Sequence, residues 1–474
     1  MLHATDHKIC GYWVYTRIFP IHIFPFNHNL YNMKLNTLVL LCVLSCTATT
    51  FGQKLSQFEK AGLVDLLIDK KGQYHAVFQE TPDYGKPSFI YYTSSSNRGV
   101  SWTKPVNISN DNTGNGAGYP RIIQDGLGTI YALWKRYGNT KNGYPIATVT
   151  TDGPGGYSPG TVFYKVLQGG AWSAAVQLNE VEQSQYSWFP TVTPQGVMMV
   201  FWTQLSPESI KNNLSAWYYA DYMRVVSLNA TARSAYTDLT VPSPPAYPGG
   251  APPQEGAISF NGYVDANNLP HFVFEEVHDN VQQVKYFDGK QSTVIYNYPK
   301  YSTFNNFNHP ATLLVDEKGV EHIIFKPAAA TLESEQIWDY SPATKQQRVL
   351  VSIAKPNVKI IKFQAWQGPA GEMAVTVQAG TYSSSRECYG SFYKRGVWTN
   401  TALTKNAAKE QFFGTEFRGL GGYPTAMAML TKYDSDFTRV AWDAQGKKAL
   451  LMNVSAYWVG GGVSSPSIVF SQLD

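Results

Sequence analysis

The sequence has little charge and no strong excess of either sign. Only 15% of its 474 residues are Asp, Glu, Lys or Arg, and the formal net charge is +4. Proteins that bind nucleic acids usually carry a clustered basic surface. No such cluster stands out here, so a nucleic-acid partner is not expected. Aromatic residues, in contrast, make up 14% of the chain, a composition that excludes a disordered protein and is typical of many short strands.

Long apolar runs are missing as well. The apolar stretch at residues 38–44 is too short to span a bilayer, so no transmembrane segment is expected. It follows Met33 and Lys34 and precedes small residues, the order typical of an export signal. We therefore predict a non-native or disordered extension over residues 1–32, with Met33 as the true start, a signal peptide over residues 33–52 and a single domain over residues 53–474.

Cysteine is scarce, and some of the cysteines lie in the predicted export signal. Residues 43–46 resemble a bacterial lipobox, so a lipid anchor at Cys46 is the alternative to a secreted or periplasmic protein. Of the four cysteines in the chain, only Cys388 lies beyond the predicted cleavage site, which excludes an internal disulfide and a cysteine zinc site. No cofactor is expected, a structural metal ion is left open, and a monomer is expected.

The sequence does contain a repeated motif, which is called the repeated phrase below. Residues 69–78, 265–274 and 316–325 share an Asp, then a Gly or Asn, then a His and a Phe; looser copies begin near residues 125 and 196. A phrase that returns in a chain of strand-forming residues indicates an array of equivalent units. Seven units of four short strands predict an all-β, seven-bladed β-propeller with antiparallel blades, and six or eight blades are the alternatives.

The repeat also makes local predictions. Gly72 and its equivalents should supply a positive φ in the first turn of each blade. His75, His271 and His322 occupy equivalent positions in the repeat, and a residue that recurs in several blades usually has a structural role. Residues 426–431 are expected in the last blade, and the final strand, at residues 467–472, is expected to close the ring with the first blade.

One turn carries a family resemblance. Residues 95–102, Ser-Ser-Asn-Arg-Gly-Val-Ser-Trp, resemble the Asp-box of sialidase-type propellers, with Asn97 in the Asp position, and residues 394–398 form a fainter copy. The whole chain is similar to the sialidase/BNR-repeat superfamily, and Tyr119-Pro120-Arg121 resembles its first arginine motif. The resemblance implies that the first and third turns of each blade share one face. The second-strand ends and first-strand starts then share the opposite face, where substrate binds.

That orientation selects substrate-binding candidates. Aromatic rings stack on the C–H faces of sugars, while amides and charged groups bind hydroxyls and carboxylates. The alternative for each ring is packing among loops, and Lys135 is expected to be an ordinary solvated charge. An acidic polysaccharide or oligosaccharide is the expected partner. The candidates are Tyr119, Arg121, Trp188, Gln204, Glu276 and Lys326.

The size, blade number and export signal also resemble a second group, the seven-bladed ulvan lyases, rhamnose–glucuronate lyases and related rhamnosidases. This resemblance implies β-elimination, in which a cation neutralises a uronate carboxylate, a base takes the C5 proton and a proton donor assists the leaving group. We predict a carbon–oxygen lyase. The alternatives are a rhamnosidase- or sialidase-like glycoside hydrolase and a non-catalytic glycan-binding propeller. The catalytic candidates are Arg136, Tyr137, His278, Tyr301 and His309.

Overall fold

The structure is a computed structural model, and it describes a set of ranges within residues 53–473. The expected N-terminal extension, the signal peptide and Cys46 lie outside these ranges. The described residues are 53–57, 61–82, 86–110, 116–137, 160–178, 185–204, 222–228, 237–239, 256–278, 281–299, 311–327, 335–353, 358–380, 387–403, 433–457 and 463–473.

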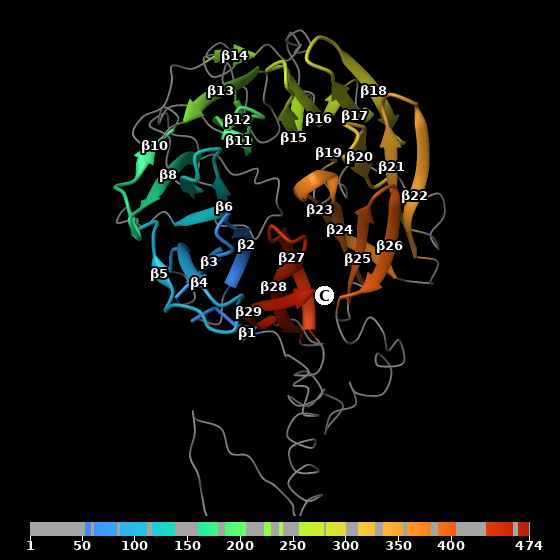
Figure 1. Cartoon of the computed structure of the whole chain (residues 1–474). Coiled ribbons are helices and arrows are strands. Elements are labelled where there is room, and N and C mark those ends of the chain that lie inside the picture. The colour runs from blue at the N-terminus through green and yellow to red at the C-terminus, as the bar shows by residue number, and fades with distance from the viewer. Residues whose placement is uncertain are drawn as a thin grey trace, which may run out of the picture. The chain divides into compact units, whose positions relative to one another are not determined.

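Seven β-sheets surround a central axis, as the sequence predicts (Figure 1). Within each blade the strands run antiparallel and follow one another outward from the axis. Blade one contains β2 (Ala61–Ile68), β3 (Tyr74–Glu80), β4 (Phe89–Ser95) and β5 (Val106–Asn107); blade two contains β6 (Ala117–Gln124), β7 (Ile130–Tyr137), β8 (Gly160–Gln168) and β10 (Val176–Gln177), with β9 (Ala171–Trp172) beside β8; and blade three contains β11 (Gln185–Val192), β12 (Met198–Gln204), β13 (Tyr222–Leu228) and β14 (Thr237–Leu239). Blade four contains β15 (Gly256–Val264), β16 (Pro270–His278), β17 (Val281–Phe287) and β18 (Ser292–Asn297), and blade five contains β19 (Thr312–Val315), β20 (Glu321–Phe325), β21 (Glu335–Ser341) and β22 (Gln346–Ile353). Blade six contains β23 (Lys359–Gln367), β24 (Met373–Gly380), β25 (Glu387–Lys394) and β26 (Val397–Ala402), and blade seven contains β27 (Tyr433–Trp442), β28 (Lys448–Tyr457), β29 (Val463–Leu473) and β1 (Gln53–Lys54).

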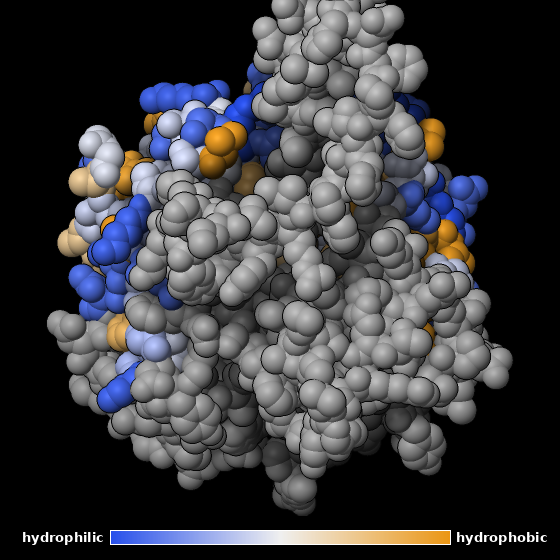
Figure 2. All heavy atoms as spheres, turned by 90° about the horizontal axis from the view of Figure 1, so that it is seen from below, coloured by the Kyte–Doolittle hydropathy of each residue, from blue (hydrophilic) through white to orange (hydrophobic). Residues whose placement is uncertain are grey.

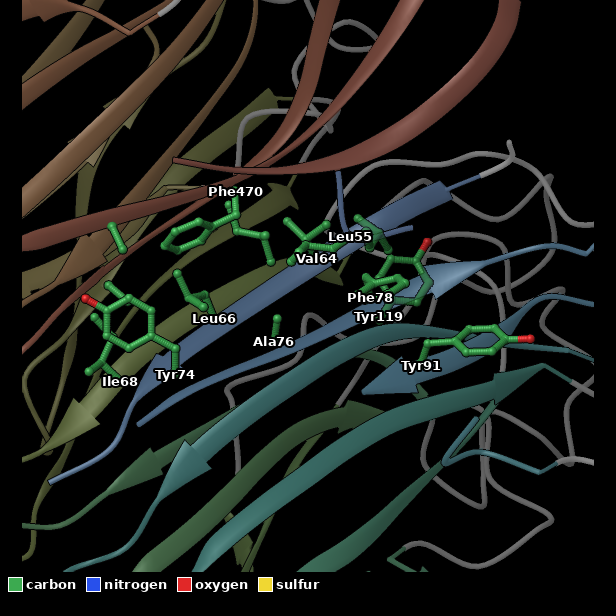
Figure 3. Packing of buried hydrophobic residues seen from close by; sticks show 14 residues of the cluster. Leu55, Val64, Leu66, Ile68, Tyr74, Ala76, Phe78, Tyr91, Tyr119 and Phe470 are labelled. Atoms are coloured by element: carbon green, nitrogen blue, oxygen red, sulfur yellow. The ribbon is translucent and has the colours of Figure 1, made fainter. Parts of the chain in front are cut away.

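The hydrophobic core lies between neighbouring blades. Alternate side chains of a strand point to opposite sheet faces, so each blade offers one apolar face to each neighbour. At the boundary of blades seven and one, Leu66, Tyr74 and Phe78 pack with Leu451 and Phe470 (Figure 3). The same arrangement recurs around the ring, and burial of these faces is the main force that holds the blades together.

The repeated phrase forms the turn between the first and second strands. Asp69 Oδ1 accepts the backbone N–H groups of Lys71 at 2.9 Å and Gln73 at 2.8 Å, and Asp265, Asp316 and Asp443 hold equivalent turns. The expected positive φ is confirmed. The residues in this conformation are Gly72, Gly128, Gly196, Asn268, Gly319, Gly371 and Gly446.

The three repeat histidines are blade architecture, as the sequence predicts. His75 Nδ1 lies 2.8 Å from the Tyr92 hydroxyl, and its Nε2 lies 3.4 Å from Asp69 Oδ2. His322 Nδ1 lies 3.0 Å from both carboxylate oxygens of Asp339. Each of these two side chains therefore fastens a first turn or a second strand to the third strand of its own blade.

Ring closure differs from the sequence prediction. The expected closing strand is part of β29, which is the third strand of blade seven and does not pair with blade one. The fourth place in blade seven is taken by β1, in which Gln53 pairs with Phe470 and Lys54 with Val469. The prediction was wrong because it left the short N-terminal strand out of the blade. The predicted strand at residues 426–431 lies outside the described residues.

Exposed large apolar side chains are scattered over the described surface. They lie on separate turns and outer strands, and the described surface visible in Figure 2 mixes hydrophilic residues with isolated hydrophobic ones. Single exposed apolar residues are normal on a folded protein. In the part of the chain that the structure describes, no helix has the length and apolar character needed to cross a membrane.

Two of the positive-φ glycines allow a stability test of turn packing. A Cβ on Gly371 would lie 1.9 Å from Glu317 N in the neighbouring blade, whereas a Cβ on Gly72 would meet nothing within 4 Å. We expect Gly72→Ala to lower the free energy of unfolding by about 1 kcal/mol, the usual cost of the left-handed conformation. Gly371→Ala should cost about 3 kcal/mol, because overpacking is added. Equal losses in urea denaturation would contradict the close contact between the two turns.

Candidate functional site

One position on the inner strands holds a polar side chain in six of the seven blades and a phenylalanine in the remaining one. It lies four residues before the Asp that begins the first turn of each blade, or before the residue that replaces this Asp. Because the inner strands surround the axis (Figure 1), this position brings together residues that are far apart in sequence. We call the set the axial ring. Its members, in blade order, are Asp65, Arg121, Phe189, Asn261, Thr312, Gln364 and Arg439.

Three adjacent members of the axial ring are charged. Asp65 Oδ1 lies 2.7 Å from Arg439 Nε of blade seven, and Asp65 Oδ2 accepts the backbone N–H of Ile122 in blade two at 2.8 Å. The same Nε of Arg439 donates to Leu66 O at 3.2 Å. Asp65 therefore links three consecutive blades close to the axis, and its carboxylate is flanked by guanidinium groups.

The two arginines of the ring differ in their surroundings. The Cζ of Arg439 lies 4.4 Å from the ring centroid of Trp366, and 22% of the Arg439 side chain is exposed. Stacking and the ion pair hold this guanidinium in a defined orientation. Burial lowers the pKa of Arg121, Asp65 raises it and Arg439 lowers it again. The three side chains carry two positive charges and one negative charge.

The amides of the axial ring bind the next blade through their oxygens. Asn261 Oδ1 accepts the N–H of Leu313 at 3.3 Å, and Gln364 Oε1 accepts the N–H of Thr438 at 2.7 Å. The carbonyl end of each amide is thus engaged, while its NH₂ end can serve as a further donor. Together with the guanidiniums, these amides make the ring rich in donors. Such a ring suits a ligand that offers acceptors, namely a carboxylate or sugar hydroxyls.

Of the substrate-binding candidates, Arg121 belongs to the axial ring. Tyr119 lies two residues earlier with a φ of 55°, at an irregularity in the pairing of β6 with β7. Tyr119 is 5% exposed and packs in the core cluster at the boundary of blades seven and one (Figure 3). Trp188 also packs against core clusters. For these two rings the packing alternative describes what the structure shows, and a role in substrate binding stays a prediction.

Lys326 and Arg136 are held in different parts of the propeller. Lys326 Nζ lies 2.8 Å from Glu335 Oε2 and donates to Ile360 O of blade six at 3.3 Å. Arg136 Cζ lies 4.4 Å from the ring of Phe163, on the third strand of its own blade. Arg136 thus lies in blade two and Lys326 in blade five, and their roles at a site stay predictions.

The same geometry corrects the expectation for Lys135. This side chain is fully buried rather than solvated, with its Nζ 5.8 Å from the ring of Tyr119. Burial lowers the pKa of Lys135 to about 7. The position of Lys135 in its blade matches that of Lys326, which bonds the next blade.

The remaining candidates are not placed by the structure. His309 and Tyr301 lie outside the described residues. The other four lie at the ends of β7, β12 and β16, where the strands are described but these side chains are not: Tyr137, Gln204, Glu276 and His278. Their catalytic and binding roles stay predictions. Among the described residues, no group of three His, Cys, Asp or Glu side chains is arranged to hold a metal ion.

Sequence reasoning missed Arg439. The sequence patterns that identify candidates are local, and the blade that carries Arg439 is the least regular in sequence. A usable signal was present, because Asp65, Arg121 and Arg439 each stand four residues before the Asp of a first turn. Aligning the blades on that Asp would have placed the three charges at one level of the ring.

A second cluster of ionisable groups joins blades four and five. Glu321 Oε1 accepts the Tyr263 hydroxyl at 2.9 Å and lies 2.9 Å from His271 Nδ1, and Glu321 Oε2 accepts the Tyr286 hydroxyl. The hydrogen bond that His271 makes to the Glu321 carboxylate raises the pKa of His271. Burial opposes ionisation of Glu321, but the hydrogen bonds from its three partners lower its pKa overall. Because the carboxylate is already satisfied, we interpret the Glu321 cluster as a contact between blades.

Comparisons with known proteins show likeness at the level of fold. No family model matches the sequence, and no curated protein matches it. A protein of unknown function from Dyadobacter fermentans aligns with a TM-score of 0.41 at 11% identity, over 89% of this chain and 97% of that chain. A leech intramolecular trans-sialidase aligns with a TM-score of 0.40 at 10% identity, over 90% and 70%. The NanB sialidase of Streptococcus pneumoniae gives 0.38 at 10%, over 89% and 70%. No activity is carried over from these proteins.

Proposed function

We propose that this protein is a carbohydrate-active enzyme that takes a carboxylate-bearing saccharide at the axial ring. The observation that supports this proposal is the pair Arg121 and Arg439, which flank Asp65 on three adjacent inner strands. A guanidinium presents a planar fork of donors that matches a carboxylate. The net positive charge of the three side chains favours an anionic sugar over a neutral one.

The reaction that we propose is β-elimination on a uronate-containing, ulvan-like polysaccharide or its oligosaccharides. Neutralising the uronate carboxylate makes the C5 proton acidic, which is the step that a guanidinium can assist. A base must then remove that proton, and His309 or His278 is the sequence candidate. Arg136, Tyr137 and Tyr301 remain candidates for charge stabilisation and for protonating the C4 leaving group. The proposed enzyme acts outside the cytoplasm.

Hydrolysis is the less favoured reaction at the axial ring. A hydrolase needs carboxylates that can donate a proton and either activate water or attack the sugar. The carboxylate of Asp65 already accepts from Leu66 N at 3.0 Å and Ile122 N at 2.8 Å, besides its 2.7 Å contact with Arg439. These three contacts occupy the Asp65 carboxylate, which leaves it poorly placed to attack a sugar or to activate water.

The test is a paired assay on the whole chain. Uronic-acid polysaccharides and their oligosaccharides are incubated with the protein, while ultraviolet absorbance of the unsaturated uronate and new reducing ends are followed in parallel. We expect both signals to rise together on an acidic substrate, with neither appearing on a neutral glucan. Reducing ends without absorbance would contradict elimination and establish hydrolysis. Binding without either signal would establish a glycan-binding propeller.

A further inference from the structure

The boundary between blades seven and one is the place where the ring closes. The only strand pairing that ties the N-terminal part of the described chain to blade seven is that of β1, and it involves two residues, Gln53 and Lys54. Such a short pairing contributes few backbone hydrogen bonds. Other contacts must therefore keep the first and last blades together, and the turn at residues 95–102 supplies several of them.

This turn, which resembles an Asp-box, is braced from within. Asn97 Oδ1 accepts the N–H of Ser101 at 2.9 Å, and Ser95 Oγ accepts the N–H of Gly99 at 2.8 Å. The Trp102 indole N–H donates to Gly99 O at 3.2 Å. Arg98 and Gly99 have φ values of 59° and 82°, and the internal bonds hold both in this conformation. The turn is a preformed surface that needs no further ordering to bind blade seven.

Arg98 makes polar contacts with blade seven. Its Nη2 donates to Asp443 Oδ2 at 2.8 Å. Asp443 is the residue that caps the first turn of blade seven, and its side chain is 3% exposed. Gln472 Nε2 of β29 donates to Arg98 O. Although burial opposes ionisation of Asp443, its hydrogen bonds, first that from Arg98, lower its pKa overall.

Gly99 and Trp102 make the apolar contact. Phe470 of β29 is 4% exposed, and its ring centroid lies 5.0 Å from that of Trp102 at 66°. The ring occupies the space where a side chain on Gly99 would lie, because a Cβ there would be 2.1 Å from Phe470 Cε1. Phe470 is also the residue that pairs with Gln53 of β1. Phe470 is therefore in contact with both the turn at residues 95–102 and strand β1.

We propose that residues 95–102 form a clasp that closes the propeller. The clasp binds Asp443, Phe470 and Gln472 of blade seven, and its contacts add to the short pairing of β1. Loosening the clasp opens the ring between blades seven and one before any other boundary. This gives the Asp-box-like motif a specific task in this chain, independent of the saccharide proposed for the axial ring.

The chain contains a matched turn that lacks these contacts. Arg395 and Gly396, in the third turn of blade six, have φ values of 51° and 86°. They therefore repeat the backbone of Arg98 and Gly99. A Cβ on Gly396 would meet nothing within 4 Å, and Arg395 is exposed. Substitutions in the two turns have the same backbone cost but differ in what they do to a neighbouring blade.

Hydrogen–deuterium exchange of the whole protein tests the proposal. We expect Arg98→Ala to raise the exchange rate of β29 amides and of residues 95–102 several-fold, with little change in blades three to five. Arg395→Ala should leave both regions at the rate of the unchanged protein. Because the Arg98 side of this ion pair is exposed to solvent, salt should screen it, and high salt should raise exchange at the same boundary in the unchanged protein.

Gly99→Ala and Gly396→Ala provide the second pair. Gly99→Ala should speed exchange of β29 far more than Gly396→Ala does, because only the first displaces Phe470. Exchange that is raised equally by Arg98→Ala and Arg395→Ala, or raised uniformly over all blades, would overturn the proposal. Exchange that opens first at another blade boundary would overturn it as well.

Discussion

Arg439→Ala is expected to lower kcat/KM on the acidic saccharide by about 100-fold or more, the usual effect of removing a donor that is aimed at the reacting charge. Arg439→Lys keeps the charge but loses the planar fork, so it should recover only part of the activity. Arg121→Ala should produce a loss of the same order. The measurement is initial rate against substrate concentration, with ultraviolet absorbance as the readout.

Arg395→Ala is the control for these arginine variants, because it removes an exposed guanidinium far from the axial ring. Circular dichroism and the thermal unfolding midpoint establish that each variant is folded. Rates that remain close to normal in folded Arg439→Ala and Arg121→Ala would exclude the axial ring as the carboxylate site. If the protein also acts on a neutral saccharide, and both arginine substitutions lower that activity by the same factor, the arginines do not recognise a carboxylate, and the axial ring would again be excluded as the carboxylate site.

Glu321→Ala is expected to lower the free energy of unfolding by about 3 kcal/mol near pH 6, the lower end of the range for removing one partner of a buried ion pair, because both side chains of this pair are partly exposed. The change leaves His271, Tyr263 and Tyr286 without their shared acceptor. Glu317→Ala is the matched control, since Glu317 is exposed in the adjacent turn. Urea denaturation measures both, and equal stabilities would contradict the role of Glu321 between blades.

The contribution of the Glu321 cluster should also depend on pH in two directions. The pKa of His271 is raised in the fold, so its contribution is complete below its ordinary pKa of 6.5 and is lost as pH rises through the folded pKa. The pKa of Glu321 is lowered, so its contribution is complete above its ordinary pKa of 4.5 and is lost as pH falls through the folded pKa. The difference in stability between the unchanged protein and Glu321→Gln should therefore be largest between these two values. A difference that is constant with pH would contradict this ionisation.

The blade repeat could be predicted because its chemistry is local. Asp69 caps a turn whose donors lie two and four residues away, and Gly72 occupies a conformation that few other residues adopt. The sequence therefore contains both the signal and its cause within a few positions. The pairing of the strand at residues 467–472 was predicted wrongly. Its neighbour in the sheet is β1, in which Gln53 pairs with a residue near the other end of the chain, and no local pattern encodes that pairing.

The axial ring was harder to predict because it depends on which side chains of different inner strands come close to one another. Lys326 and Arg136 follow the repeat at the end of second strands, so the sequence ranks them with Arg121. In the fold, Lys326 pairs with Glu335 of its own blade and bonds Ile360 O of blade six, while Arg121 lies beside Asp65 on the inner strands. The difference is one of direction rather than of residue type. Periodicity along one strand does not tell which side chains of different blades come close to one another.

The pairing of Gln53 with Phe470 also has a consequence for the order of folding. The outer edge of blade seven is completed by a segment that is synthesised first, whereas the strand it needs is synthesised more than four hundred residues later. Contacts between such distant segments form late, because the entropy of closing so large a loop must be overcome first. Individual blades can therefore assemble as the polypeptide emerges, but the circle is completed only after nearly the whole chain has been released.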